Sequence, residues 1–253
     1  MESIAQLRDI CRRDNDEDNR RTMMLAARVS IYFTRLFLLM KMSANQVTYL
    51  FTALGIVGAL AFLGPGLYWA VAGYLLFRLH VIVDVSDGEV ARYRQTFSPI
   101  GAYLDFITHY FVYNIICFSI PFRYWMDSGW SVALASGAVL MMGVTLNRAG
   151  VDCWFRANFG SSERDEIEEG RQGQEKSGLP GIAKKFVLSI GHITSIQSFL
   201  NVYILALIVE RIFGTDIRAY LIPAYAIVLL SFSLGRIGYT IYRGKIPRRA
   251  NYY

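Results

Sequence analysis

Four residues whose side chains can bind cations or accept protons lie close together in the first half of the chain. Asp84 and Asp87 occur in the run DVSDGEVAR, and Asp105 and His109 occur in the run GAYLDFITH, which follows Arg92 after eight intervening residues. On a helix, residues three or four positions apart share a face, so each run presents its pair on one side. The linker YRQTFSPI contains a Ser-Pro step that can turn the chain back. The two pairs can therefore meet across a helix hairpin.

These acids are informative because they lie at the edge of apolar sequence. A carboxylate inside a membrane segment costs about 2.5–3.5 kcal/mol, and several together also repel one another. A divalent cation, or two of them, would remove this penalty and could clamp a pyrophosphate group. Oxygen ligands favour Mg²⁺ or Mn²⁺, and we expect two such ions here. The alternative is that the acids simply lie in water at the membrane edge. Small residues nearby would allow close approach of a helix or a ligand: Gly88, Ala91, Gly101 and Ala102.

The elements that must position these residues are membrane spans. Of the 253 residues, 54% are hydrophobic and 18% are charged, against roughly 25% charged in soluble domains. Six hydrophobic segments each approach the ~20 residues that cross a bilayer. We therefore predict an all-α integral membrane protein, a bundle of six transmembrane helices at residues 46–64, 67–84, 100–124, 129–149, 186–210 and 217–242.

A different kind of helix is expected before the first span. In residues 22–41, Arg28 and Arg35 are seven positions apart and share one face, while most apolar side chains lie elsewhere. This pattern favours an N-terminal amphipathic helix in the membrane interface, with a seventh span as the alternative. The residues before it are polar and lack the apolar core of a secretory signal. We divide the chain into a leader with this helix (1–41) and a six-helix membrane domain (42–253), which includes a cytoplasmic loop at 157–183.

The distribution of basic residues predicts the orientation. With Met1 in the cytoplasm, 21 of the 26 Lys and Arg residues lie on the cytoplasmic side, which is a strong positive-inside bias. We expect a multi-pass protein of the cytoplasmic membrane, with both termini and the acidic residues facing the cytoplasm. The exceptions are Arg78 and Arg236 within apolar segments, and Arg123, Arg211 and Arg218 at the outer face.

Composition argues against two other kinds of site. The net charge of +6 fits basic segments that lie against an anionic membrane face, so we expect no nucleic acid partner. The three cysteines are scattered and form no CxxC pair, which makes a disulfide framework or a thiolate metal site improbable.

Further polar residues in the apolar segments could contact a substrate. Arg148 lies at the cytoplasmic end of the fourth segment, and Arg236 lies about two turns from the inner end of the sixth. Either could hold a substrate phosphate. Snorkelling to lipid headgroups is an equal alternative for Arg148, whereas the depth of Arg236 favours the phosphate. His80, four residues before Asp84, could orient that carboxylate or be a buried histidine with other partners.

The spacing of the two runs resembles the signature of the CDP-alcohol phosphotransferases, also called CDP-alcohol phosphatidyltransferases. That signature is DxxDGxxAR, eight residues, then GxxxDxxxD. In addition, the stretch SANQVT resembles the PNxxT entry that precedes the first span in many members, with Ala44 in place of the proline. The residues that match are Asn45 and Thr48 in the entry, and Asp84, Asp87, Gly88, Ala91, Arg92, Gly101 and Asp105 in the signature.

The resemblance implies a membrane enzyme that cleaves the pyrophosphate of a CDP-alcohol, transfers the phosphoalcohol group to an acceptor hydroxyl and releases CMP. We prefer CDP-diacylglycerol as donor with a soluble alcohol as acceptor, and the alternative is a small CDP-alcohol with a lipid acceptor. Family likeness further implies a homodimer among membrane lipids. By the same likeness, Asp84, Asp87 and Asp105 would hold the metals, and the substrate site would include Asn45, Thr48, Gly88, Ala91, Arg92 and Gly101, to which we add Arg148 and Arg236.

His109 departs from the family pattern, where an aspartate is credited as general base and metal neighbour. A histidine can act as the base, because its ordinary pKa near 6.5 suits neutral pH. It can also be a neutral metal ligand that shifts the preference towards Mn²⁺. Asp105 and His109 are thus the candidate catalytic residues, and His109 is also a candidate ligand. An altered acceptor or metal scheme and a non-catalytic relative stay open. A transporter is disfavoured, because the acids cluster at one edge instead of lining a path.

Overall fold

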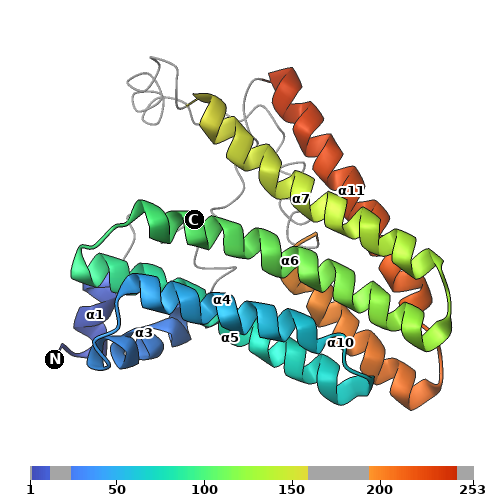
Figure 1. Cartoon of the computed structure of the whole chain (residues 1–253), viewed down its shortest axis with the longest axis horizontal. Helices are drawn as coiled ribbons and strands as arrows, with labels where there is room; N and C mark the ends of the chain where they lie inside the picture. The colour runs from blue at the N-terminus through green and yellow to red at the C-terminus, as the bar shows by residue number, and fades with distance from the viewer. Residues whose placement is uncertain (1, 12–23, 159–193, 244–253) are drawn as a thin grey trace.

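The computed structural model describes residues 2–11, 24–158 and 194–243, and these ranges contain helices and no strand. The predicted all-α class is therefore confirmed for the part of the chain that is described. The predicted loop at 157–183 lies outside the described residues, except for its first two positions, which end a helix. In chain order (Figure 1), the helices are α1 (Ile4–Cys11), α3 (Met24–Leu39), α4 (Ala44–Ala61), α5 (Gly66–Arg94), α6 (Pro99–Ser128), α7 (Val132–Asn158), α10 (Ile196–Phe213) and α11 (Arg218–Arg243).

Five stretches among the described helices are long and apolar enough to cross a membrane, which indicates a multi-pass integral membrane protein. They are α4, α5 and α10 over their whole lengths, Val132–Trp154 of α7 and Arg218–Tyr242 of α11. Helix α6 is not among them, although its 30 residues would extend about 45 Å. Asp105, His109 and Asn114 interrupt its apolar sequence. The sixth span, and with it the six-helix count, stays a prediction.

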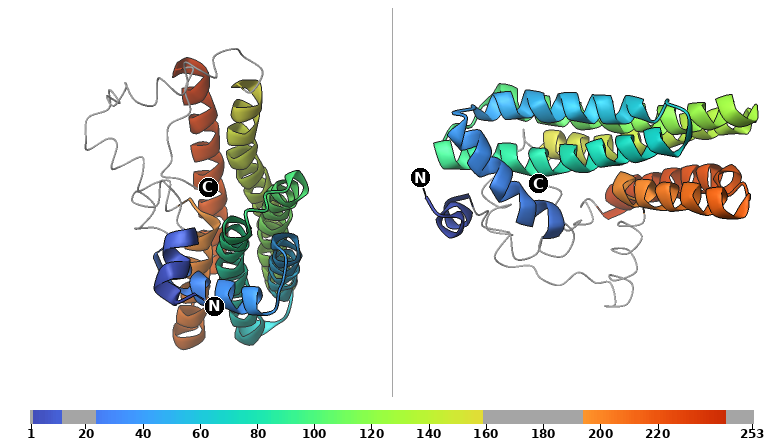
Figure 2. Two further views of the ribbon diagram at one scale, coloured as in Figure 1. Left: turned by 90° about the vertical axis from the view of Figure 1, so that its left-hand side faces the viewer. Right: turned by 90° about the horizontal axis from the view of Figure 1, so that it is seen from below.

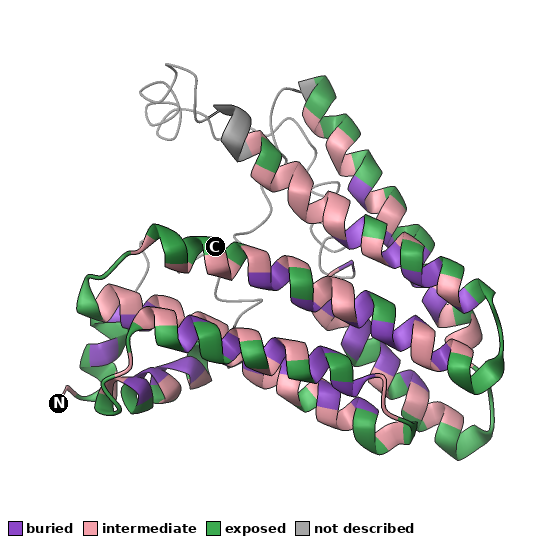
Figure 3. Cartoon of the chain, viewed as in Figure 1, coloured by how far each residue is buried: buried purple, intermediate pink, exposed green. Residues whose placement is uncertain are grey.

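Helix α4 lies between the two helices that carry the acidic runs. It packs along both α5 and α6, while α7 packs against α6 and α11, and α10 contacts α5 and α11 (Figures 1 and 2). The approach of α4 to α5 is close, because a Cβ on Gly73 would lie 2.8 Å from the carbonyl oxygen of Gly58. Buried residues lie mostly where these helices face one another (Figure 3), and the main buried cluster includes Phe77, Ile116 and Phe199.

The turn between α5 and α6 forms where the Ser-Pro step predicts it. Gln95 adopts a left-handed conformation (φ 52°), and its backbone N–H bonds back to the carbonyl oxygens of Ala91 and Arg92. Ser98 caps α6 by accepting a hydrogen bond from the N–H of Gly101 (3.3 Å). Helix α5 continues ten residues beyond the predicted span end at residue 84. The prediction ended the span at the first charged residues, where the hydrophobic run stops. The helix itself ends only at Gln95, whose left-handed conformation interrupts the helical hydrogen bonds.

The N-terminal helices pack on the outside of α5. Helix α3 covers the predicted amphipathic segment and lies obliquely to α4 and α5 (Figure 2). Its residues Ser30, Ile31 and Thr34 are buried, so one face of α3 is covered by protein. The position of this helix at the membrane surface stays a prediction. Helix α1 was not predicted from the sequence, and its residues Leu7 and Cys11 are buried in a small cluster with Ile31.

Candidate metal centre

Three of the four predicted ligands converge between α5 and α6. Asp84 comes from α5, and Asp105 and His109 come from successive turns of α6. Each offers one ligand atom, and these three atoms lie within 4.8 Å of one another. His109 Nε2 is 3.2 Å from Oδ1 of Asp105 and 3.6 Å from Oδ1 of Asp84. His109 is buried and the two carboxylates are partly buried, so the cluster is a compact site within the protein.

The donor set fits a divalent cation. Among the described residues, none donates a well-aligned hydrogen bond to the buried Oδ1 of Asp105, although Nε2 of His109 lies 3.2 Å from it. A bound cation would satisfy this oxygen. Neighbouring ligands of an octahedral Mg²⁺ lie roughly 3 Å apart, which is close to the separations that the cluster already has. Two carboxylate ligands suit either Mg²⁺ or Mn²⁺. The imidazole ligand favours Mn²⁺ over Mg²⁺.

Asp87, the fourth predicted ligand, has a different partner. Its Oδ2 accepts a hydrogen bond of 2.7 Å from Oγ1 of Thr48, which is buried on α4. The carboxylate is not part of the three-residue cluster. The entry motif at the start of α4 thus orients the second aspartate of the signature. Asn45 on the same turn of α4 faces the start of α6, where a Cβ on Gly101 would lie 2.8 Å from its Oδ1.

Gly88, Ala91 and Arg92 continue the face of α5 that carries Asp84 and Asp87, and all are partly buried. Arg92 also reaches the N-terminal helices, because its Nε donates a 2.7 Å hydrogen bond to the carbonyl oxygen of Cys11. Helix α1 therefore contacts the signature directly.

The two predicted arginines near the C-terminal ends of α7 and α11 take different positions. The guanidinium of Arg148 lies 5.9 Å from the centre of the Tyr110 ring, and its charge acts on both Asp84 and Asp105. Arg236 donates a 2.6 Å hydrogen bond from Nη1 to Oδ1 of Asn147, which ties α11 to α7. The structure brings Arg148 near the cluster and shows no contact between Arg236 and the cluster residues among those that are described.

His80 is fully buried beneath the site. Its Nδ1 lies 2.8 Å from the carbonyl oxygen of Phe51, and its Nε2 has no hydrogen-bond partner in the described structure. No hydrogen bond joins it to Asp84 in the described part of the chain, and its ring lies 6.0 Å from that of His109, centre to centre. The geometry favours a buried packing residue over a direct partner of Asp84.

Sequence reasoning missed the role of the signature's other face. Glu89 is 8% exposed, and its carboxylate accepts hydrogen bonds from Oγ of Ser30 (2.8 Å) and Oγ1 of Thr34 (2.5 Å). Ser86 donates to the carbonyl oxygen of Ser30 (3.1 Å). One face of this part of α5 thus carries the signature residues, and the other binds α3. The sequence did contain a signal for this contact. Two hydroxyl residues four positions apart in α3 share a helix face, and together they can donate hydrogen bonds to a buried carboxylate.

Fold and site together define a polytopic α-helical membrane protein with an Asp-Asp-His cluster suited to a divalent cation. The family model described as CDP-alcohol phosphatidyltransferase matches residues 41–177, more than half of the chain, and the chain belongs to this family. The matched range covers every predicted site residue except Arg236. Among curated proteins, none matches the chain closely enough to count as a relative. The resemblance seen in the signature is thus confirmed, and the family's reaction is the transfer of a phosphoalcohol group from a CDP-alcohol.

Proposed function

We propose that the protein is a metal-dependent transferase that moves a phosphatidyl group from CDP-diacylglycerol to the hydroxyl of a soluble alcohol and releases CMP. The observation that carries this proposal is the convergence of Asp84, Asp105 and His109 on one point between α5 and α6. Family membership supports the reaction type, and the cluster supports the metal. The preference for CDP-diacylglycerol as donor rests on the compact six-helix plan expected from the sequence.

The proposed chemistry is a displacement at phosphorus. The acceptor oxygen bonds to the β-phosphorus while the bond from that phosphorus to the bridging oxygen breaks, and the electron pair leaves with CMP. The proton of the acceptor passes to the Asp105–His109 pair, whose side chains are 3.2 Å apart. Arg148 adds positive charge on the same side, which favours the negatively charged transition state.

The metal would be held by Asp84, Asp105 and His109, and it would supply charge neutralisation for the pyrophosphate and the leaving CMP. The proposal includes a second ion with Asp87 as a further ligand, since the family signature implies Asp87 among the metal ligands and Thr48 orients its carboxylate. His109 takes the position of the family's last aspartate. As a neutral ligand it makes the site less negative by one charge, and we therefore expect Mn²⁺ to support turnover better than Mg²⁺.

For the substrate site, we propose that Asn45, Gly88, Ala91 and Gly101 shape the space for the CDP moiety. Arg92 would contact it from the α1 side, and Thr48 would act through Asp87. Arg148 and Arg236 are the proposed contacts of the phosphate or of the acceptor.

The membrane arrangement is also part of the proposal. Counting α6 gives six spans, with the cluster and both termini on the cytoplasmic side of the cytoplasmic membrane. Residues 1–41 form the leader and interfacial helix, and residues 42–253 form the catalytic domain. A homodimer is carried over from the family.

The test is CMP release by the purified full chain in nanodiscs that contain CDP-diacylglycerol. Mn²⁺ or Mg²⁺ and a panel of soluble alcohols and phospho-alcohols are added, with Asp105→Asn as the matched control. We expect release that requires one alcohol, needs the metal and disappears in the control. Release without any alcohol would indicate a hydrolase, and no release with any alcohol would overturn the CDP-diacylglycerol assignment. Small CDP-alcohols with lipid acceptors then form the second arm, and failure of both arms would overturn the transferase itself.

A further inference from the structure

A second polar region lies at the end of the bundle opposite the acidic cluster. Asp105 and Arg123 are both on α6, eighteen residues apart by their numbers, which corresponds to about 27 Å along the helix. The hydrocarbon core of a bilayer is about 30 Å thick. If the acidic cluster lies near one membrane interface, Arg123 lies near the other. The turns that join α4 to α5, α6 to α7 and α10 to α11 gather at this same end (Figure 1).

A pocket of about 620 Å³ opens at this end, between the start of α5 and the ends of α6 and α10. Phe62 and Leu207 are among its apolar wall residues, and Phe62 is almost fully buried. Charged side chains surround the same space, among them Arg123, Glu210 and Arg211. The pocket therefore combines an apolar wall with a charged rim at the level expected for a membrane interface.

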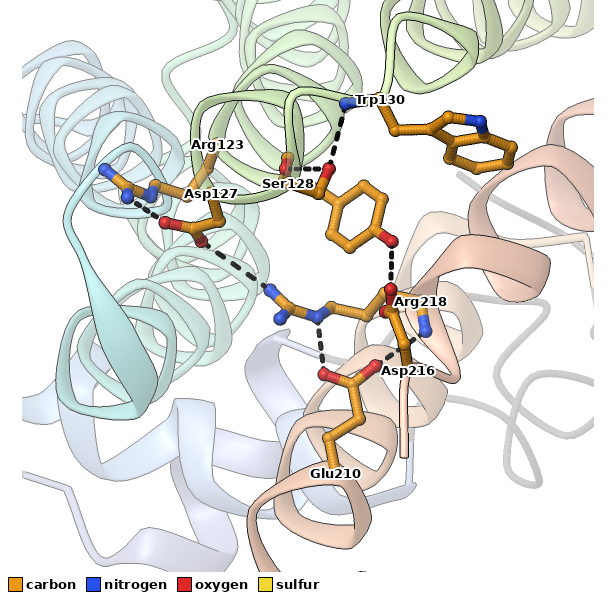
Figure 4. Close-up of polar contacts among 8 residues, drawn as sticks. Arg123, Asp127, Ser128, Trp130, Glu210, Asp216 and Arg218 are labelled. Atoms are coloured by element: carbon orange, nitrogen blue, oxygen red, sulfur yellow. Dashed lines mark hydrogen bonds and ion pairs between the residues drawn. The ribbon is translucent and has the colours of Figure 1, made fainter. Parts of the chain in front are cut away.

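The rim carries more positive than negative charge. Asp127 pairs with Arg123 and, at 3.9 Å, with Nη1 of Arg218. Glu210 receives hydrogen bonds of 2.6 Å from both the backbone N–H and Nε of Arg218 (Figure 4). These two acids are thus occupied by two arginines. Arg211 is the third arginine of the rim, and the described residues provide no ion pair for it. Among the residues that line the pocket, one positive charge is therefore left over, and Asp216 beside the rim is hydrogen-bonded to Tyr124.

A further unsatisfied group points to the same kind of ligand. Arg123 lines the pocket, and its Nε–H is buried without a hydrogen-bond acceptor in the described structure. A buried donor without a partner costs about 1–3 kcal/mol, so an acceptor is expected there. Its partner Asp127 already bonds to Nη2 of the same guanidinium. The guanidinium of Arg123 is thus only partly paired within the protein, and an anionic oxygen at the rim would meet its charge together with that of Arg211.

We propose that this pocket binds an anionic phospholipid of the leaflet opposite the acidic cluster. The phosphate lies at Arg211 and Arg123, and the first part of an acyl chain lies along Phe62 and Leu207. A phosphodiester carries the required charge and acceptor oxygens, and the apolar wall explains why a lipid is preferred to a free ion. The site is separate from the CDP-alcohol site, so this proposal is independent of the proposed reaction.

The experiment measures thermal protection of the purified full chain in neutral detergent during titration with phosphatidylglycerol. Phosphatidylcholine of the same acyl chains and inorganic phosphate form the other two arms. We expect phosphatidylglycerol to raise the unfolding temperature and the other two to have much smaller effects. Equal protection by phosphatidylcholine would overturn the charge argument, and equal protection by inorganic phosphate would show an anion site without a lipid.

Three variants locate the effect. Arg211→Gln should weaken the apparent affinity for phosphatidylglycerol about fivefold. Leu207→Trp, which fills the pocket without a change of charge, should also weaken it. Arg35→Gln removes the same charge from an exposed position on the predicted interfacial helix α3, where it reports the general attraction of an anionic lipid, and should cause a clearly smaller loss than Arg211→Gln. An equal loss in Arg35→Gln, or no loss in either pocket variant, would overturn the site.

Discussion

Helix α6 carries a polar cluster at each end, and the two clusters differ in how their charges are balanced. At the C-terminal end of α6, here called the outer end, Asp127 pairs with Arg123, and Glu210 holds Arg218 through two hydrogen bonds (Figure 4). Near its N-terminal end, here called the inner end, two carboxylates share one histidine, and among the described residues the buried oxygen of one of them accepts no hydrogen bond. Each acid of the outer cluster thus has an arginine as its partner, whereas the two acids of the inner cluster share a single imidazole.

This difference in charge pairing suggests that the acids of the outer cluster stabilise the fold and that those of the inner cluster take part in chemistry. The outer cluster joins the end of α6 to α10 and α11, and Tyr124 on α6 adds a 2.5 Å hydrogen bond to Asp216. An acid that already has its arginine has little left to offer a ligand. Carboxylates held close together without such partners destabilise the fold and are kept where they bind something. The comparison therefore supports a structural role for the outer acids and the proposed cation binding for the inner ones.

The largest expected effect comes from removing one inner carboxylate. Asp84→Asn should lower CMP formation about 100-fold or more, because loss even of groups that only support a ligand costs 10–100-fold. Its unfolding temperature should not fall, because the change removes repulsion between two acids. Thermal unfolding with and without Mn²⁺ checks this, and Mn²⁺ should protect the native chain but not the variant. A clear drop in unfolding temperature without metal would mean that Asp84 is structural.

A smaller effect of the opposite kind is expected at the outer end. Glu210→Gln should lower the free energy of unfolding by about 1–3 kcal/mol, because Arg218 loses its charged hydrogen-bond acceptor. CMP formation per folded molecule should be unchanged. Denaturant unfolding in detergent measures the loss, and Asp9→Asn, at an exposed position on α1, is the control that should change little. If activity falls while stability is kept, the two ends are coupled and the division of roles is wrong.

The smallest effect is expected where the N-terminal helices meet α5. Burial, assisted by the nearby charge of Glu89, raises the pKa of the Cys11 thiol to about 11. The thiol is therefore protonated from pH 7 to 9, and alkylation should be slow there and accelerate only as the pH approaches 11. Glu89→Gln should loosen α3 and raise alkylation of Cys11 at pH 8 severalfold, as read by mass spectrometry. Rapid alkylation in the native chain would contradict the packing of α1.

Much of the fold was predictable, because the bilayer imposes a length on apolar runs. The segment at 46–64 corresponds to α4, and the Ser-Pro step marks the turn before α6. Helix ends were less predictable. Helix α7 continues to Asn158, nine residues past its predicted end at 149, since backbone hydrogen bonds continue beyond the apolar run. Helix α1 was missed because its eight residues are fewer than the roughly 11–18 over which a helical period can be read reliably.

The candidate site was predictable to the extent that local spacing defines it. Helical periodicity alone places Asp105 beside His109, and Asp84 on the same face as Asp87. Spacing could not show that Asp87 would bond to Thr48 while Asp84 joins the pair on α6. That division depends on how α4 is inserted between α5 and α6.

By itself, then, the sequence determined the family, the class of fold and the two runs that supply the acids, because signature spacing and apolar run length are local properties of the chain. Only the tertiary structure decided which acid meets which partner. It placed Glu89 against Ser30 and Thr34, and it balanced Glu210 with Arg218 while leaving Asp84 and Asp105 beside a single histidine. Whether a charge is balanced depends on its distance from charges on other helices, and helix packing sets that distance. The spacing of residues along one helix gives no information about it.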